Sequence, residues 1–99
     1  MAESQQGQAG IELGDQLDIT VASVMKQRFS GALANEQPIE IDGASLERVD
    51  TAGIQLLVAF SRAAAEGPGW TWRGGEVPTK VAQVARPLGL EDEIRGYSA

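Results

Sequence analysis

The segment Val49-Asp50-Thr51-Ala52-Gly53-Ile54 is the part of this sequence best suited to chemistry. It places an acid and a hydroxyl directly before an apolar run that is typical of a helix, and either side chain can cap a helix. A hydroxyl in the first turn of a helix also lies near unpaired amides and the positive end of the helix dipole, which suits a phosphoryl group. We therefore single out Thr51 as a candidate phosphorylation site.

The residue types on which most enzymes and metal sites depend are missing. The 99 residues include no His and no Cys, so Ser-His and Cys-His pairs and imidazole or thiolate metal sites cannot form. Asp42 and Asp50 could together hold a hard cation or do acid–base work. A strand-end role for Asp42 and a cap role for Asp50 explain them more simply. We expect no catalytic residue, no metal and no cofactor.

Two other segments carry weaker signals. The run from Gly74-Gly75 to Lys80 superficially resembles a phosphate cradle, but it lacks the Gly-x-x-x-x-Gly-Lys order, and Pro78 removes one amide. A plain turn is therefore favoured. Trp70 and Trp72 point to the same side of a short strand. They could form a binding platform, although a role in the core is the more common one.

The composition limits the possible partners. The net charge is −6, and the eight Lys and Arg residues are scattered singly, which disfavours nucleic acid and anionic membranes as partners. No apolar run approaches the roughly 18 residues of a membrane span, and Met1–Gly10 lacks the apolar core of a signal peptide. We expect a cytoplasmic protein with a flexible lead over residues 1–10 and one domain over residues 11–99.

Alternating strands and helices must position these residues. The expected strands are Ile11–Leu13, Leu17–Ile19, Pro38–Asp42 and Trp70–Trp72. The expected helices run from Asp18 or Thr20 to Ala34, from Asp50 or Thr51 to Ala65, and from a cap at Thr79 to about Leu88, with a last turn over Leu90–Ile94. Their inward faces would carry Val21, Val24, Met25, Phe29 and Leu33, then Ile54, Leu57, Val58 and Ser61, then Val81, Val84, Ala85 and Leu88. The alternation predicts an α/β domain with parallel pairing.

Three segments resemble the STAS family (sulphate transporter and anti-sigma-factor antagonist). The first is a hydrophobic strand that ends in Asp, Ile39–Asp42, followed by the motif from Val49 to Leu57. The second, Leu13-Gly14-Asp15-Gln16-Leu17-Asp18-Ile19, is similar to the family's first-strand signature. The third, Val84–Leu90, is similar to its last-helix pattern. Together they span about residues 11 to 95.

This resemblance implies a single sheet of about four strands packed against three to four helices, no enzymatic activity, and binding to other proteins. In the family's bacterial anti-sigma-factor antagonists, a partner kinase phosphorylates the hydroxyl at the Thr51 position, which releases the antagonist from its partner. The partner would be an anti-sigma factor resembling a serine/threonine kinase. The chain itself would be a monomer or a weak dimer. The implied partner-binding residues are Asp42, Asp50, Thr51, Ala52 and Gly53.

Other branches of the family leave two alternatives open. The chain could be a constitutive subunit of an ABC lipid-transport complex or of a chemotaxis or receptor-signalling complex, with Thr51 making contacts but never modified. It could also bind a nucleotide or another small molecule. Only the Gly74-Gly75 turn supports this alternative. Thr51 stands where many antagonists have Ser, so a kinase for this position does not follow from the motif alone.

Overall fold

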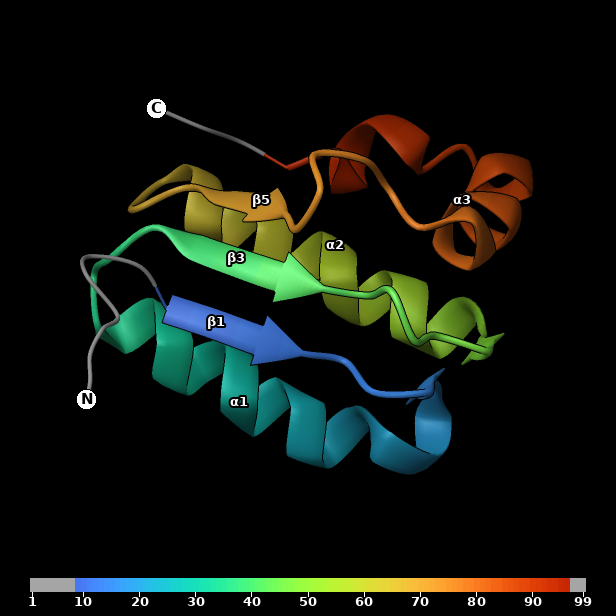
Figure 1. The fold of residues 1–99 in the computed structure, drawn as a ribbon, viewed down its shortest axis with the longest axis horizontal. Coiled ribbons are helices and arrows are strands. Elements are labelled where there is room, and N and C mark those ends of the chain that lie inside the picture. Colours follow the sequence, from blue (N-terminus) through green and yellow to red (C-terminus); the bar gives the residue numbers. More distant parts are fainter. Residues whose placement is uncertain (1–8, 97–99) are drawn as a thin grey trace.

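Figure 1 shows the fold of the protein in a computed structural model, which describes residues 9–96. The five strands are β1 (Ala9–Glu12), β2 (Gln16–Leu17), β3 (Ile39–Asp42), β4 (Arg48–Val49) and β5 (Trp70–Trp72). The three α-helices are α1 (Ala22–Ala34), α2 (Thr51–Ala65) and α3 (Thr79–Ala85). Short 3-10 turns are η1 (Ile19–Val21), η2 (Arg86–Leu88) and η3 (Glu91–Ile94).

The strands form two small parallel sheets. The main sheet has the order β1-β3-β5, with Ile11 opposite Ile41 and Ile41 opposite Trp72. A separate ribbon pairs β2 with β4. The α/β architecture with parallel pairing is confirmed. The main sheet has fewer strands than the four expected, since the left-handed turn at Gly14 (φ 73°) separates β2 from β1 and β2 then pairs with β4.

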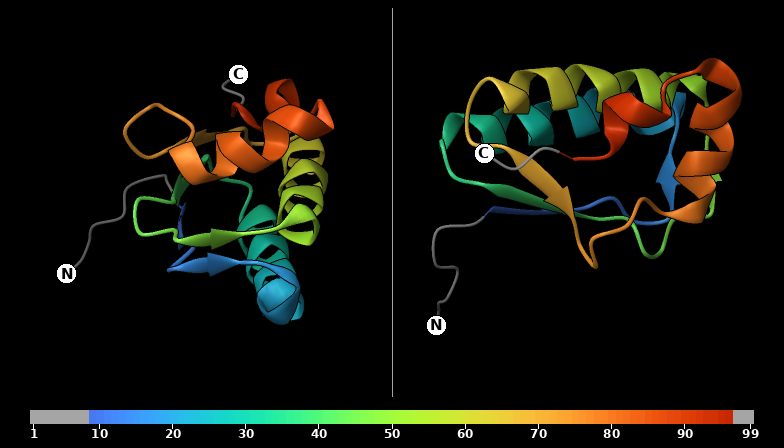
Figure 2. Two further views of the ribbon diagram at one scale, coloured as in Figure 1. Left: turned by 90° about the vertical axis from the view of Figure 1, so that its right-hand side faces the viewer. Right: turned by 90° about the horizontal axis from the view of Figure 1, so that it is seen from above.

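Helices α1 and α2 cover one face of the main sheet, as the view from above in Figure 2 shows. Strand side chains alternate between faces, so Ile39 and Ile41 turn toward the helices and are fully buried. Each helix connects two parallel strands, and the two helices therefore run in the same direction. The result is a two-layer domain with its core between the sheet and this helix pair.

The opposite face of the main sheet is polar. Arg73, directly after β5, donates from Nε to Glu40 at 3.0 Å and from a terminal nitrogen to Asp42 at 3.2 Å. The hydrogen bond and charge of Glu40, followed by the charge of Asp42, raise the pKa of Arg73 above its ordinary value. These pairs are solvent-exposed, so their main effect is to fix the ends of β3 and β5 rather than to add much stability.

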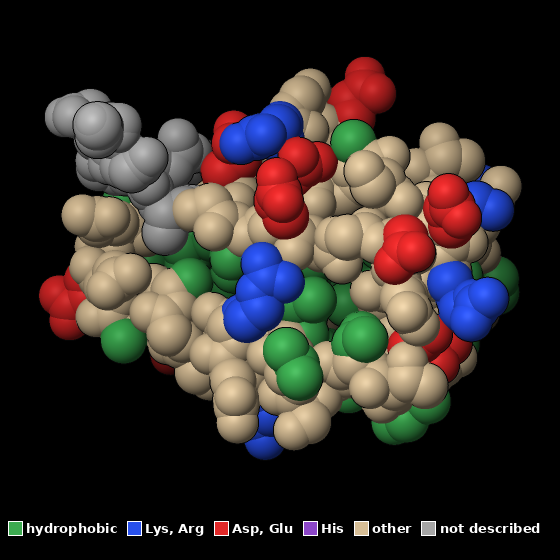
Figure 3. All heavy atoms as spheres, turned by 60° about the horizontal axis from the view of Figure 1, so that its bottom comes forward, with side chains coloured by type: hydrophobic (Ala, Val, Ile, Leu, Met, Phe, Trp, Pro, Cys, Tyr) green, Lys and Arg blue, Asp and Glu red, His purple; other side chains and the backbone are tan. Residues whose placement is uncertain are grey.

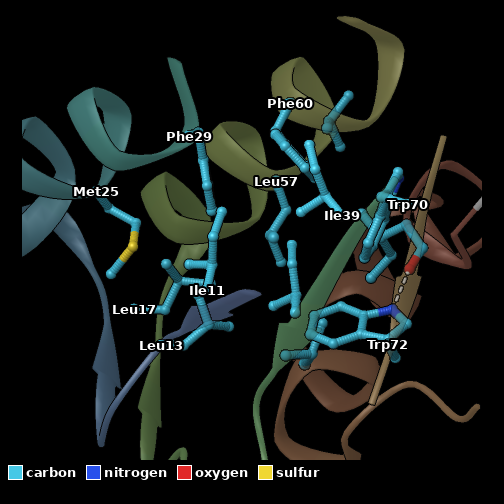
Figure 4. Packing of buried hydrophobic residues seen from close by; sticks show 14 of the residues in the cluster. Ile11, Leu13, Leu17, Met25, Phe29, Ile39, Leu57, Phe60, Trp70 and Trp72 are labelled. Atoms are coloured by element: carbon cyan, nitrogen blue, oxygen red, sulfur yellow. Dashed lines mark hydrogen bonds between the residues drawn. The ribbon is translucent and has the colours of Figure 1, made fainter. Parts of the chain in front are cut away.

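The core is built around the middle of α2. Ile54 and Leu57 are fully buried, and Phe60 contacts Phe29 of α1 with ring centroids 4.6 Å apart. In Figure 4, Leu57 and Phe60 point from α2 toward the strand that carries Ile39. The placement of Ile54, Leu57 and Val58 on the inward face of this helix is confirmed.

Trp70 and Trp72 are core residues. They are 1% and 3% exposed, and their rings meet edge-on at 5.1 Å. Both indoles have a hydrogen-bond acceptor: Trp70 donates to the Ser61 hydroxyl at 3.0 Å, and Trp72 donates to the Ile94 carbonyl at 2.7 Å, the bond dashed in Figure 4. A binding platform made of these two rings is therefore excluded.

The predicted burial of two helix residues and one predicted helix cap are wrong. Val24 is 60% exposed and Leu88 is 41% exposed, because α1 presents a narrower apolar stripe than the spacing predicted and α3 gives way to η2 at Arg86. Pro78 is the N-cap of α3, and Thr79 is its first residue with no capping bond.

The predicted boundaries near the N-terminus also shift. Ile19 starts a 3-10 turn that Asp18 caps, and is not part of a strand. Ala9 and Gly10 belong to β1, where the flexible lead was expected to reach Gly10. The remainder of that lead, residues 1–8, lies outside the described residues.

Candidate functional site

The Asp50 side chain connects the start of α2 to the η1 turn through two hydrogen bonds. Its Oδ1 accepts from the Gly53 amide at 2.9 Å, which caps the helix, and its Oδ2 accepts from the Ile19 amide at 3.2 Å. Its own amide donates to the Leu17 carbonyl at 3.3 Å. The carboxylate thus satisfies a free helix donor and also holds the η1 turn against the N-terminus of α2.

Gly53 allows the main chain of Leu17 to approach α2. A Cβ on Gly53 would lie 2.1 Å from the Leu17 carbonyl oxygen, a distance that no side-chain carbon can occupy. Gly53 is itself buried. The missing side chain of Gly53 makes room for the main chain of β2 against the helix.

Thr51 is the accessible residue of the motif. It is the first residue of α2 and is exposed, whereas Asp50 and Ala52 are half-buried. None of the hydrogen bonds among residues 9–96 uses its hydroxyl. Ile19, whose amide shares the Asp50 carboxylate, is 67% exposed and brings an apolar side chain to the same end of the fold.

Asp18 also belongs to this region, although its sequence context predicts only a capping role. It is 6% exposed and accepts from the amide and hydroxyl of Thr20 and from the side chain of Gln16. The Thr20 hydroxyl bond is the main reason that the pKa of Asp18 lies below its ordinary value of 3.8, and burial opposes it. Leu17-Asp18, within the segment similar to the family's first-strand signature, is the sequence signal for this second anchored carboxylate.

Asp42 and Asp50 have different bonding partners. Asp42 accepts from the Ala44 amide at 3.0 Å and from Arg73, whereas Asp50 binds the amides of Gly53 and Ile19. Within residues 9–96, no group of three or more acidic side chains is gathered in a way that could hold a metal ion. The strand-end role of Asp42 and the helix-cap role of Asp50 account for the bonds from the Ala44 and Gly53 amides. Arg73 and the Ile19 amide are additional donors to these two carboxylates.

The Gly74-Gly75 segment is a turn. Both residues have left-handed φ values of 87° and 82°, and the Gly75 amide donates to the Trp72 carbonyl at 2.9 Å. A surface hollow of about 250 Å³ lies nearby, bordered by Arg73, Pro78 and Lys80. Pockets that enclose small-molecule ligands are typically larger, about 300–1,000 Å³.

Charged side chains of both signs are interspersed on the face drawn in Figure 3, with apolar side chains between them. No wide basic surface is visible on that face. Among the helices described, none is both long and apolar enough to cross a membrane.

The match to known families agrees with this geometry. The family model described as "Mlab, STAS domain" matches residues 1–96. The chain belongs to the STAS domain family. A comparison with curated proteins finds no match to this chain. STAS domains generally mediate protein–protein interaction, so this STAS domain is a binding module in that general sense.

Proposed function

We propose that this STAS domain is a non-catalytic, cytoplasmic regulatory module of the bacterial anti-sigma-factor-antagonist type. It binds a protein partner through the surface around the N-terminus of α2. Phosphorylation of Thr51 releases that partner. The observation that carries the proposal is the exposed Thr51 hydroxyl at the first position of a 15-residue helix whose start is rigidly anchored.

The anchoring supports a switch that acts on binding rather than on folding. Asp50, Gly53 and Leu17 fix the main chain on both sides of Thr51 through contacts that do not involve its side chain. A phosphate adds about −1.5 to −2 charges at pH 7, and the helix N-terminus offsets part of this by typically about 0.3–1 kcal/mol. The fold therefore accepts the modification.

The partner would sense the added charge directly. Juxtaposed like charges or a buried unpaired charge at an interface cost several kcal/mol, and about 1.4 kcal/mol corresponds to a tenfold change in affinity. Ile19, whose amide donates to the neighbouring Asp50 carboxylate, supplies exposed apolar surface at the same end of the fold. A phosphate on Thr51 would bring charge to an interface that buries this apolar surface. We expect at least a tenfold loss of affinity.

The test compares Thr51→Glu and Thr51→Ala with wild type. The partner is first recovered with tagged protein from native lysate, identified, and purified for calorimetric titration. Thr79 offers a matched control, because it is also an exposed Thr at the first position of a helix. We expect Thr51→Glu to weaken binding at least tenfold, and Thr51→Ala and Thr79→Glu to leave it near the wild-type value. Equal affinity for Thr51→Glu and wild type would refute the switch.

A second candidate is a constitutive subunit of an ABC lipid-transport complex or of a receptor-signalling complex. Two observations favour it: the matching family description carries the name Mlab, and the motif residues Asp50 and Gly53 have structural roles that need no modification of Thr51. This candidate predicts that the native protein carries no phosphate and that its complex stays intact through purification.

A further inference from the structure

An apolar groove runs along the outer side of the helix pair, between α1 and α2. Two adjoining surface hollows form it, and they share Leu33 and Ala63. Its walls are mainly apolar: Phe29, Leu33, Leu56, Ala59, Phe60 and Ala63. Leu33 and Leu56 are only partly buried although they pack against the core. Within residues 9–96, no other element covers this groove, since both hollows are lined by α1, α2 and the loops that follow them.

The groove carries opposite charges at its two ends. Lys26 borders the first hollow, near the start of α1, and Glu36 borders the second, just beyond the end of α1. Glu36 lies ten positions after Lys26, so the two charges are about 15 Å apart along the direction of the helix axis. The small residues Ser30 and Ala59 line the groove between Lys26 and the shared Leu33 and Ala63.

The groove, with a positive charge at one end and a negative charge at the other, is complementary to the same groove on a second copy. A two-fold axis perpendicular to the groove and passing near its middle would place Lys26 opposite Glu36 of a second copy, and Glu36 opposite Lys26 of that copy. Such reciprocal contacts are the rule in two-fold interfaces. The axis also makes the helices of the two copies antiparallel, which opposes their dipoles favourably, and the small residues near the middle allow the helices to approach closely.

We propose that a second copy of this chain occupies the groove, and that the protein forms a weak two-fold dimer through α1 and α2. The helix pair offers a face about 20 Å long and about 20 Å wide, hence about 400 Å² on each copy. The total is below the roughly 1,200–2,000 Å² of stable complexes. The dimer therefore dissociates readily. It leaves the exposed hydroxyl of Thr51 free, because Thr51 does not line the groove.

Charge reversal tests this pairing without any other protein. Lys26→Glu and Glu36→Lys each turn both inter-copy ion pairs into repulsions, so we expect each to weaken dimerisation about tenfold or more at low salt. The double variant exchanges the two charges and restores both pairs. Sedimentation equilibrium up to about 1 mM protein measures the dissociation constants.

The matched controls change the same charge at exposed positions outside the groove. Lys80→Glu matches Lys26→Glu, and Glu76→Lys matches Glu36→Lys. We expect both controls to dimerise like wild type, and Ala59→Asp to abolish dimerisation while circular dichroism shows an intact fold. A wild-type protein that stays monomeric at about 1 mM would overturn the proposal. So would single reversals without effect, or a double variant that fails to regain the dimer.

Discussion

Gly53 of α2 packs directly on the main chain of Leu17 in β2, so closely that a Cβ at position 53 would lie 2.1 Å from the Leu17 carbonyl oxygen. The contact joins β2 to the helix that carries Thr51. The Asp50 carboxylate strengthens the same junction through the amides of Gly53 and Ile19. The surface around Thr51 is therefore assembled from two separate segments that are locked together.

Gly53→Ala should destabilise the protein strongly. In an ordinary helix this change is stabilising by about 1 kcal/mol, but here the new methyl group must displace main chain, and overpacking typically costs about 1–3 kcal/mol or more. Gly31 of α1 is the matched control, since it is a helical glycine whose added Cβ would meet nothing within 4 Å. Urea unfolding should show Gly31→Ala slightly more stable than wild type. Similar stabilities for the two variants would contradict the Leu17 contact.

Leu57→Ala should cost about 2–5 kcal/mol of unfolding free energy. Leu57 is fully buried at the centre of the core, so the truncation removes apolar contacts and leaves a cavity. Gln55→Ala, on the exposed side of the same helix, should lie within about 0.5 kcal/mol of wild type. Chemical denaturation of the three proteins measures the difference, and a Leu57→Ala protein as stable as Gln55→Ala would refute this packing.

Asp50→Ala should lower stability by about 1–3 kcal/mol, since it removes the capping bond to the Gly53 amide and the bond to the Ile19 amide. Asp50→Asn should lose less, because Asn caps helices nearly as well. Asp92→Ala serves as the control: the Asp92 side chain is 85% exposed and its pair with Arg95 lies at the surface. If Asp50→Ala and Asp92→Ala melt at the same temperature, the cap contributes nothing.

Asp18 should make the protein less stable in acid. Its pKa is lower in the folded protein than the ordinary value of 3.8, chiefly because the Thr20 hydroxyl donates to its carboxylate. The carboxylate therefore stabilises the fold above that ordinary value, and this contribution is lost as the pH falls through the lower, folded-state pKa. The stability gap between wild type and Asp18→Asn should shrink between about pH 6 and about pH 2. A gap that stays constant over this range would show that ionisation of Asp18 plays no part.

Local periodicity was enough to predict α2, β3 and β5. Ile54, Leu57 and Val58 recur at helical spacing, and Ile39 and Ile41 alternate, so burial follows directly from the pattern. The same pattern wrongly predicts that Val24 is buried. Val24 continues the apolar spacing of α1 but lies outside the contact with the sheet. Which part of an apolar stripe is buried depends on the neighbouring elements, and one helix in isolation does not specify them.

The motif around Thr51 was recognised from sequence, but the reason for its glycine was not. Position 53 needs a glycine because the main chain of Leu17, 36 positions earlier in the chain, packs against α2 at this point. The second bond of Asp50, to the Ile19 amide, has the same long-range origin. Local spacing predicts the cap and a hydroxyl in the first turn of the helix, whereas the pairing of β2 with β4 depends on the tertiary structure.

The proposed switch at Thr51 is tested most directly by the affinity of the identified partner for unmodified protein and for protein phosphorylated on Thr51. Phosphopeptide mass spectrometry of native protein first establishes whether Thr51 carries phosphate. We expect a modified fraction, a dissociation constant at least tenfold higher for the phosphorylated form, and an unchanged melting temperature. Native protein without phosphate, together with equal affinity of the partner for both forms, would contradict it.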